Sequence, residues 1–285
     1  AHRRVLMAGG IGTRPMGVAD VPAAAAAVLE GGWGDRLTFF AWAVGHRACR
    51  PFVAVEGERI VGTGVGTAYG PVGWVGTIFV VPDRRGSGLG RRLIQAVIDD
   101  LERRGCRTLV LIATGLGRPI YERLGFERLA DHVRFSIHGS LGATGPDRVR
   151  PMAEADFPAI LALDRAATGE DRATILTGLI GPESTRVAVR KDGSIGGYVA
   201  RGPWGGGALV APDPDDALEL LEWRRRRAGP EALVATGLPD SNTAGRARLR
   251  SAGWSESPAA VRMFRGEPLD WRPDWIWGQF NGALG

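Results

Sequence analysis

Residues 80–91 read Val-Val-Pro-Asp-Arg-Arg-Gly-Ser-Gly-Leu-Gly-Arg, and the predicted fold is organised around this glycine-rich stretch. Residues 74–79, which precede it, are apolar and rich in β-branched side chains, so they predict a strand that ends at Pro82. Behind it, apolar side chains recur every three or four residues from Leu89 to Leu101, which predicts an amphipathic helix closed by Gly105. The stretch is therefore expected to join a strand to a helix.

A loop in this position can bind an anion. The first amides of a helix have no intrahelical acceptor, and the helix dipole is positive at that end. Glycines at 86, 88 and 90 would let the backbone wrap closely around a phosphate. Their spacing differs from the dinucleotide fingerprint Gly-x-Gly-x-x-Gly, and a Walker A loop needs a lysine where this chain, whose only lysine is Lys191, has none. Both nucleotide motifs are therefore excluded.

The six residues from Arg85 to Gly90 resemble the acyl-CoA loop of the GCN5-related N-acetyltransferase (GNAT) superfamily. Residues 107–114 predict the next strand, and residues 119–126, Pro-Ile-Tyr-Glu-Arg-Leu-Gly-Phe, predict a short helix. In GNAT enzymes a tyrosine-containing segment ending Leu-Gly-Phe lies beside the CoA thiol, and the shared order makes the resemblance specific. It implies an α/β (α+β) fold in which a mixed, mostly antiparallel sheet is flanked by helices.

The chain also contains an internal repeat. Arg14-Pro15-Met16 recurs as Arg150-Pro151-Met152, and Gly125-Phe126 recurs as Gly253-Trp254. We therefore predict two tandem GNAT-like domains: residues 1–140, which carry the acyl-CoA site, and a degenerate copy at residues 147–285. A glycine-rich linker at 139–146 would join them. This organisation resembles the tandem bacterial GNAT proteins.

The second copy has lost the anion-binding loop. Residues 209–217 read Leu-Val-Ala-Pro-Asp-Pro-Asp-Asp-Ala, so three aspartates stand where the first copy has glycines and arginines. Carboxylates would repel a pyrophosphate. We expect that this copy does not bind CoA in the same way.

The resemblance implies roles for individual residues. The backbone of Phe79 and Val80 would pair with the pantetheine arm, and Tyr121, a phenol with a reference pKa of about 10, would donate its proton to the CoA sulfur. The pyrophosphate would be held by the backbone amides and arginine side chains of the loop: Arg85, Gly86, Ser87, Gly88, Leu89, Gly90 and Arg91.

The general base and the acceptor contacts are less well defined. Many GNAT enzymes carry a glutamate on the strand before the loop, but residues 77–80 include no carboxylate. Glu30, Asp35 and His46 lie near the expected acceptor side, but a cap or surface position explains each of them better than a role as the base. A water chain or an acceptor that arrives deprotonated is the alternative. The predicted substrate contacts are Glu30, Trp33, Tyr69, Arg172 and Tyr198. The tryptophan-rich stretch 269–280 suggests a lid or a subunit interface, with core packing favoured over both.

The composition of the chain argues against several other classes of protein. The 285 residues fit one or two domains, and the net charge of +5 comes from scattered arginines without interleaved aromatics, which argues against nucleic acid. Two cysteines and four histidines in unrelated positions predict neither a disulfide framework nor a metal site. There is no apolar run of membrane-spanning length, and we interpret the start, residues 1–4, as a loose leader. A reducing cytoplasm is the expected setting.

The predicted function is that of a cytoplasmic acyl-CoA-dependent N-acyltransferase, most simply an N-acetyltransferase. Its acceptor would be the amine of a small molecule or peptide bound between the two domains, and a homodimer is left open. Two alternatives remain. One is a non-catalytic acyl-CoA-binding or regulatory module. The other is a transferase that uses a longer or carrier-protein-bound acyl group, which Gly62, Gly64 and Gly66 would leave room for.

Overall fold

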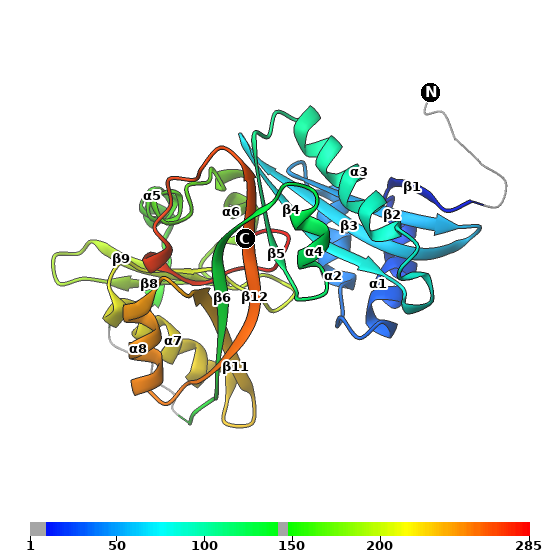
Figure 1. Cartoon of the computed structure of the whole chain (residues 1–285). Helices are drawn as coiled ribbons and strands as arrows, with labels where there is room; N and C mark the ends of the chain where they lie inside the picture. The colour runs from blue at the N-terminus through cyan, green and yellow to red at the C-terminus, as the bar shows by residue number, and fades with distance from the viewer. Residues whose placement is uncertain (1–9, 142–147) are drawn as a thin grey trace. The chain divides into compact units, whose positions relative to one another are not determined.

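The computed structural model describes residues 10–141 and 148–285 and divides into two compact units (Figure 1). The first unit comprises the described residues up to Leu111 together with Gly282–Leu284, and the second comprises residues from Ile112 to Asn281 with Gly285. The predicted leader at residues 1–4 and most of the predicted linker lie outside the described residues.

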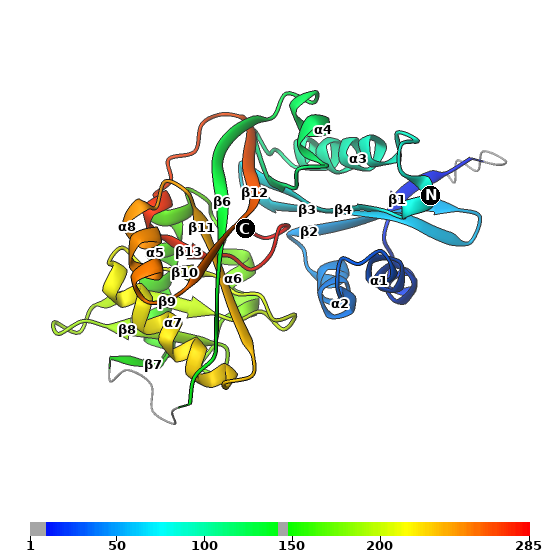
Figure 2. The same ribbon diagram turned by 60° about the horizontal axis from the view of Figure 1, so that its bottom comes forward.

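The first unit is built on a mixed sheet. Its strands, in spatial order, are β1 (Gly12–Pro15), β2 (Cys49–Glu56), β3 (Arg59–Tyr69), β4 (Val72–Val80) and β5 (Thr108–Ala113). The first four strands pair antiparallel, and β5 runs parallel to β4. Helices α1 (Val21–Glu30) and α2 (Leu37–Gly45) cover one face, and α3 (Leu89–Arg103) covers the other (Figure 2). The strand, loop and helix predicted around residues 80–91 are confirmed.

Helix α3 packs closely on β3 because that strand is rich in glycine. The apolar side chains that the sequence singled out, from Leu89 to Leu101, are buried under the helix. A Cβ added at Gly62 would lie 2.7 Å from Leu93 Cδ1, and one at Gly66 would lie 3.2 Å from Val97 Cγ1. These glycines therefore make room for α3. They give no support to the expectation that they leave room for a longer acyl group.

The second unit has two sets of strands. One is a five-stranded sheet in the order β13 (Ile276–Gly278), β10 (Leu209–Val210), β9 (Ile195–Ala200), β8 (Thr185–Val189) and β7 (Val149–Pro151). In the other, β6 (Glu127–His138) pairs antiparallel with both β11 (Leu233–Pro239) and β12 (Ser255–Gly266). The helices are α4 (Arg118–Glu122), α5 (Phe157–Thr168), α6 (Ala173–Leu179), α7 (Pro214–Ala228) and α8 (Thr243–Ser251).

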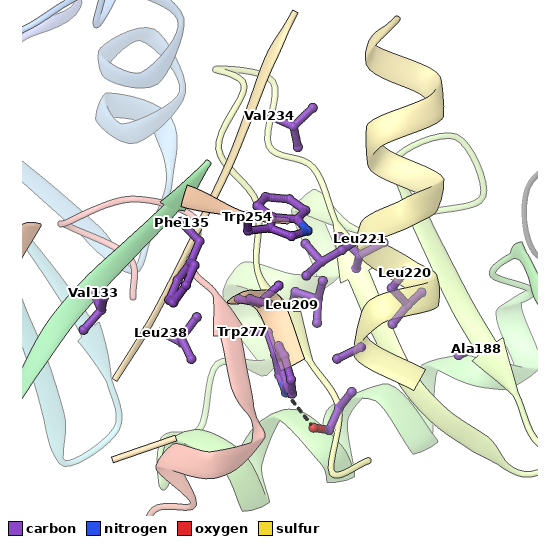
Figure 3. Close-up of a cluster of buried hydrophobic side chains, with 14 residues drawn as sticks. Val133, Phe135, Ala188, Leu209, Leu220, Leu221, Val234, Leu238, Trp254 and Trp277 are labelled. Carbon is purple, nitrogen blue, oxygen red and sulfur yellow. Dashed lines mark hydrogen bonds between the residues drawn. The ribbon is translucent and has the colours of Figure 1, made fainter. Parts of the chain in front are cut away.

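The core of the second unit is an apolar cluster between α7 and these strands (Figure 3). Phe135, Leu220 and Trp277 are completely buried in it, and Trp277 Nε1 donates a hydrogen bond to Ala211 O at 3.1 Å. Phe280 is also buried. The stretch 269–280 therefore contributes to the core, as the sequence favoured, and the lid or subunit interface is not needed to explain it.

The two sequence copies begin with the same local structure. In the first copy Arg14 pairs with Asp20 at 2.6 Å, and in the second Arg150 pairs with Asp156 at 2.6 Å. Each aspartate also accepts a backbone N–H three residues upstream, at 2.7 Å in both cases. The predicted repeat is thus visible as a repeated strand, single helical turn and helix. The boundaries 1–140 and 147–285 stay a prediction about the copies, because the compact units divide elsewhere.

Candidate acyl-transfer site

The glycine-rich loop follows β4 directly. After a single 3-10 turn at Pro82–Arg84, the chain passes through Gly86 (φ +78°) and Gly88 (φ +79°) before α3 begins at Leu89. Both glycines have a left-handed backbone, which other residues adopt only at a cost. Gly88 is the N-cap of α3 and has no side-chain oxygen to occupy the first amides of the helix. The loop is exposed, so its amides can face a ligand.

Ion pairs on either side hold the loop in shape. Arg84 forms a hydrogen-bonded pair with Glu56 on β2, with Nη2 to Oε2 at 2.8 Å, and Arg59 pairs with Asp83 at 2.7 Å. The hydrogen bonds from Arg59 lower the pKa of Asp83, so this carboxylate stays ionised at neutral pH. Ser87 Oγ donates to Arg84 O at 2.7 Å. The Ser87 hydroxyl thus serves the loop itself, and what it offers a ligand is its backbone.

The edge of β4 that faces β5 opens towards the loop. Residues Val72–Trp74 pair with Thr108–Val110, whereas the recorded partners of β4 near its end lie on β3. Between these two parts of β4, the register of its pairing with β3 shifts around Thr77. In the described part of the chain, Thr77 is the one residue other than glycine with a positive φ (51°). A strand edge left open in this way can pair with an extended ligand.

Phe79 and Val80 lie at this end of β4. The ring of Phe79 is buried and meets the Trp33 ring edge-on, with centroids 5.8 Å apart. A Cβ at Gly31 would lie 2.3 Å from Phe79 Cζ, so the ring also requires that glycine. The carbonyl of Val80 accepts a hydrogen bond from Arg85 Nε at 3.1 Å. Part of the Arg85 guanidinium is therefore engaged within the loop, a contact that the sequence did not predict.

Tyr121 lies in α4, in the second unit. Its side chain is buried, and its ring meets the Phe126 ring edge-on at 5.7 Å. Burial raises the pKa of Tyr121 well above its ordinary value, so the phenol carries its proton at neutral pH. That protonation state is the one a proton donor needs. The role of Tyr121 towards the CoA sulfur stays a prediction.

Family models match both halves of the chain. The model of the acetyltransferase (GNAT) family matches residues 26–126, which include the loop and Tyr121, and a second acetyltransferase (GNAT) domain model matches residues 160–278. The chain belongs to the GNAT acetyltransferases. It is a tandem GNAT protein and an N-acyltransferase, as the sequence predicted, and enzymes of this family use an acyl-CoA.

Similar proteins support this assignment. An N-acetyltransferase of Bacillus subtilis, YitH, described as uncharacterized, is 25% identical over 76% of this chain and 78% of its own length. Among solved structures, a candidate acetyltransferase from Pyrococcus horikoshii superposes with a TM-score of 0.83 at 19% identity, covering 100% of this chain and 99% of that one. A tandem GNAT protein from the clavulanic acid biosynthesis pathway covers 92% of this chain and 100% of its own, with a TM-score of 0.59 and 15% identity. The two structures show a shared fold.

In this GNAT protein, the residues predicted for the acceptor side of the first unit fall into two groups. Glu30 and Trp33 are exposed around the end of α1. Asp35 and His46 are engaged instead: Asp35 Oδ1 accepts from Leu37 N at 2.7 Å, and His46 Nδ1 accepts from Ala48 N at 3.2 Å. Of the three predicted bases, Glu30 is thus the one at an exposed position without such a local structural bond.

Tyr69 is buried, and its hydroxyl donates to Leu284 O at 2.8 Å. The segment Gly282–Leu284 crosses β4 here, so that a Cβ on Gly76 would lie 2.3 Å from Gly282 O. This placement favours a structural role for Tyr69 over the predicted substrate contact. Sequence reasoning missed the segment, because nothing in residues 282–284 indicates a partner more than 200 positions earlier.

Arg172 and Tyr198 lie inside the second unit. Arg172 Nε donates to Asp164 Oδ2 at 2.9 Å, Arg172 Nη2 donates to Asp164 Oδ1 at 2.5 Å, and Tyr198 donates to the same Oδ1. All three side chains are buried, and burial raises the pKa of Tyr198 well above its ordinary value. The geometry therefore favours a buried polar network over the substrate contacts predicted for Arg172 and Tyr198.

The helix start that corresponds to the loop is occupied by carboxylates in the second copy. Asp213 caps α7 by accepting from Asp215 N at 2.8 Å, and the buried Asp216 pairs with Arg148 at 3.0 Å and Arg190 at 3.1 Å. Internal carboxylates thus take the place of an external anion, in line with the expectation that this copy does not hold pyrophosphate in the same way.

Among the described residues, no group of three or more histidine, cysteine, aspartate or glutamate side chains could hold a metal ion. Within residues 10–141 and 148–285, no helix is both long enough and apolar enough to cross a bilayer.

Proposed function

We propose that this protein transfers an acyl group, most simply acetyl, from CoA to the amine of a small molecule or a peptide. The observation that carries the proposal is the exposed loop of Gly86 and Gly88, which presents the uncapped start of α3 beside the open edge of β4. The amides of Leu89, Gly90 and Arg91 belong to the first turn and can hold a pyrophosphate, with Arg85 and Arg91 adding positive charge.

The chemistry requires two proton movements. The amine nitrogen attacks the thioester carbonyl carbon, a C–N bond forms, and the C–S bond breaks to release CoA as a thiolate. The amine loses one proton, and the thiolate takes up one. We assign the second transfer to Tyr121, whose phenol is protonated at neutral pH. The amides at the end of β4 would stabilise the oxyanion.

The proton that leaves the amine needs a base other than a β4 carboxylate, because residues 77–80 carry none. The exposed position of Glu30 at the end of α1 makes it a candidate for this base. A water molecule, or an acceptor that arrives deprotonated, would serve as well. Replacing Glu30 with Gln separates these options: a lower kcat at neutral pH that recovers as the pH rises would favour Glu30 as the base.

The test of the proposal is calorimetric titration of acetyl-CoA and longer acyl-CoAs, followed by a panel of amines with detection of the released thiol. We expect one tight site per chain and thiol release that depends on the acceptor. Arg85→Gln should weaken CoA binding. Arg103→Gln should not, because Arg103 is at the far end of α3 and its side chain is 71% exposed. Binding with no acceptor-dependent release would favour a carrier-bound acyl donor or an acceptor outside the panel, and the absence of binding would contradict the loop assignment.

A further inference from the structure

The second unit contains a cavity of about 690 Å³ that the acyl-transfer reaction does not use. It lies where the end of α7 meets the start of β11, with walls from β6 and from the glycine-rich stretch 205–207 before β10. Figure 2 labels α7, β6, β10 and β11 within this unit. Since the carboxylate-filled start of α7 is at the opposite end of that helix, the cavity does not correspond to the acyl-CoA loop of the first copy.

The charged residues that line the cavity are basic. They are Arg134, Arg201, Arg224 and Arg227, and the lining includes no aspartate or glutamate. Within residues 10–141 and 148–285, none of these four side chains forms a salt bridge, whereas Arg148 and Arg150 of the same unit pair with Asp216 and Asp156. Like charges around one hollow repel each other, most strongly where a side chain is partly buried, and a bound anion would reduce that repulsion.

Arg224 shows this repulsion most clearly. One of its nitrogens, Nη2, donates to Ala235 O at 3.1 Å, which leaves other N–H groups of the guanidinium available. Burial lowers the pKa of Arg224, and the nearby charge of Arg201 lowers it further. The pKa of Arg186, whose guanidinium stacks on the Trp223 ring at 4.8 Å, is lowered by burial and then by Arg227. A bound anion would relieve the unfavourable interactions in both pairs.

The remaining walls are apolar or tightly constrained. Val199, Trp223 and Val234 supply apolar surface. Gly207 admits no side chain, because a Cβ there would lie 1.9 Å from Ala200 O. His132 is held neutral at pH 7, since burial and then the charge of Arg262 lower its pKa to about 4. The histidine can thus accept or donate a hydrogen bond without adding to the charge.

We propose that this cavity binds a small organic anion, with a phosphate or carboxylate group held by Arg201, Arg224 and Arg227 and an apolar body packed against Val199, Trp223 and Val234. Charge-assisted bonds to several arginines provide affinity for the anionic group, and the apolar wall favours a ligand with a flat, poorly hydrated body. The volume suits a ligand of drug-like size. The proposal does not depend on the acyl-transfer function.

The test uses two probes that share a flat body and differ in the anionic group: adenosine diphosphate and naphthalene-2,6-dicarboxylate. Each is titrated calorimetrically into wild-type protein and into an Arg201→Gln/Arg227→Gln variant. Both of these arginines are exposed, so the substitutions should leave the fold intact. We expect at least one probe to bind in a way that the double variant weakens by about tenfold or more and that added salt also weakens.

The matched control is Arg85→Gln, which alters the loop of the first unit. A probe held in the cavity loses affinity in the double variant and keeps it in the Arg85 variant, whereas a probe held by the acyl-CoA loop shows the reverse. Affinity that is unchanged in the double variant, or no binding of either probe at millimolar concentration, would overturn the proposal. The two probes also tell which of the two anionic groups the cavity prefers.

Discussion

Gly88 and Gly105 offer a matched pair of substitutions at the two ends of α3. Gly88 has φ +79° and precedes the helix, while Gly105 has φ +86° and follows it. A Cβ at either position would meet no atom within 4 Å, so an alanine at either site introduces backbone strain without a steric clash. Both Gly88→Ala and Gly105→Ala should therefore lower the free energy of unfolding by about 1 to 2 kcal/mol, the cost of a left-handed backbone for an L-residue.

The two substitutions should differ in ligand binding. At Gly88 the strain falls on the residue that sets the direction of the Leu89, Gly90 and Arg91 amides. If the loop relaxes by moving, CoA binding must restore the strained form, and a cost of about 1.4 kcal/mol corresponds to a tenfold increase in the dissociation constant. Gly105 is at the other end of the helix. Its alanine variant should bind CoA with unchanged affinity.

Urea denaturation and calorimetric CoA titration of the two variants measure both effects. The reasoning requires similar losses of stability together with a loss of affinity for Gly88→Ala alone. Unchanged CoA affinity in the Gly88 variant would refute the assignment of these amides to the pyrophosphate. Equal weakening in both variants would show that affinity follows general stability rather than loop geometry.

Three further predictions concern groups outside the loop. Tyr121→Phe should lower kcat while leaving the CoA dissociation constant almost unchanged, and an unaltered rate in steady-state assays would remove the phenol from the mechanism. Asp164→Ala should lower the free energy of unfolding, measured by urea denaturation, by about 3 to 5 kcal/mol, because it leaves the buried Arg172 without its carboxylate. As a control, Glu122→Ala removes an exposed pair with Arg118 and should lower it by less than about 1 kcal/mol. His132 has a pKa of about 4 in the folded protein and near 6.5 in the unfolded chain, so the unfolded chain binds the extra proton and the free energy of unfolding should fall by up to about 3 kcal/mol as the pH drops from 6.5 to 4. In His132→Gln this part of the pH dependence should disappear. Identical profiles for the variant and the wild type would contradict the burial of a neutral histidine.

The sequence predicted the elements around the loop well because their signals are local. The periodicity of α3 identified its buried face, and Pro82 marked the end of β4. The role of the glycines on β3 depends on residues distant in the sequence. Gly62 and Gly66 could have lined a ligand site or received a helix, and only the distances to Leu93 and Val97 decide for the helix.

Three of the predicted substrate contacts are buried polar residues. Tyr69, Arg172 and Tyr198 are polar side chains near predicted element ends, a pattern that fits a substrate contact and an internal hydrogen bond equally well. Their partners, Leu284 for Tyr69 and Asp164 for the other two, are distant in sequence, so no spacing rule could find them. Burial decides between the two roles, and single-sequence patterns report it poorly for polar residues.

The cavity arginines were missed for a related reason. No sequence pattern links Arg134 and Arg201 to Arg224 and Arg227, and all four were counted only among the arginines that give the chain its positive charge. They come from β6, the end of β9 and α7, elements that are brought together only by the fold. Arg224 and Arg227 belong to a run of four arginines at residues 224–227, but that run does not indicate that Arg134 and Arg201 lie beside it in the fold.

The two copies show how one helix N-terminus can be kept for a ligand or closed to it. Both begin with the same Arg–Asp pair, so the frame of the repeat is retained. In the first copy, Gly88 leaves the start of α3 without a cap, and its amides have to be satisfied by water or by a ligand. In the second copy, Asp213 caps α7 and Asp216 is neutralised by Arg148 and Arg190. An aspartate cap is worth a few tenths of a kcal/mol more than a glycine cap, so the second copy gains some stability from residues that remove its anion site. Loss of the loop in that copy is therefore a stabilising change wherever ligand binding is no longer required, whereas the first copy keeps its uncapped helix at a cost in stability that binding of an anion would offset.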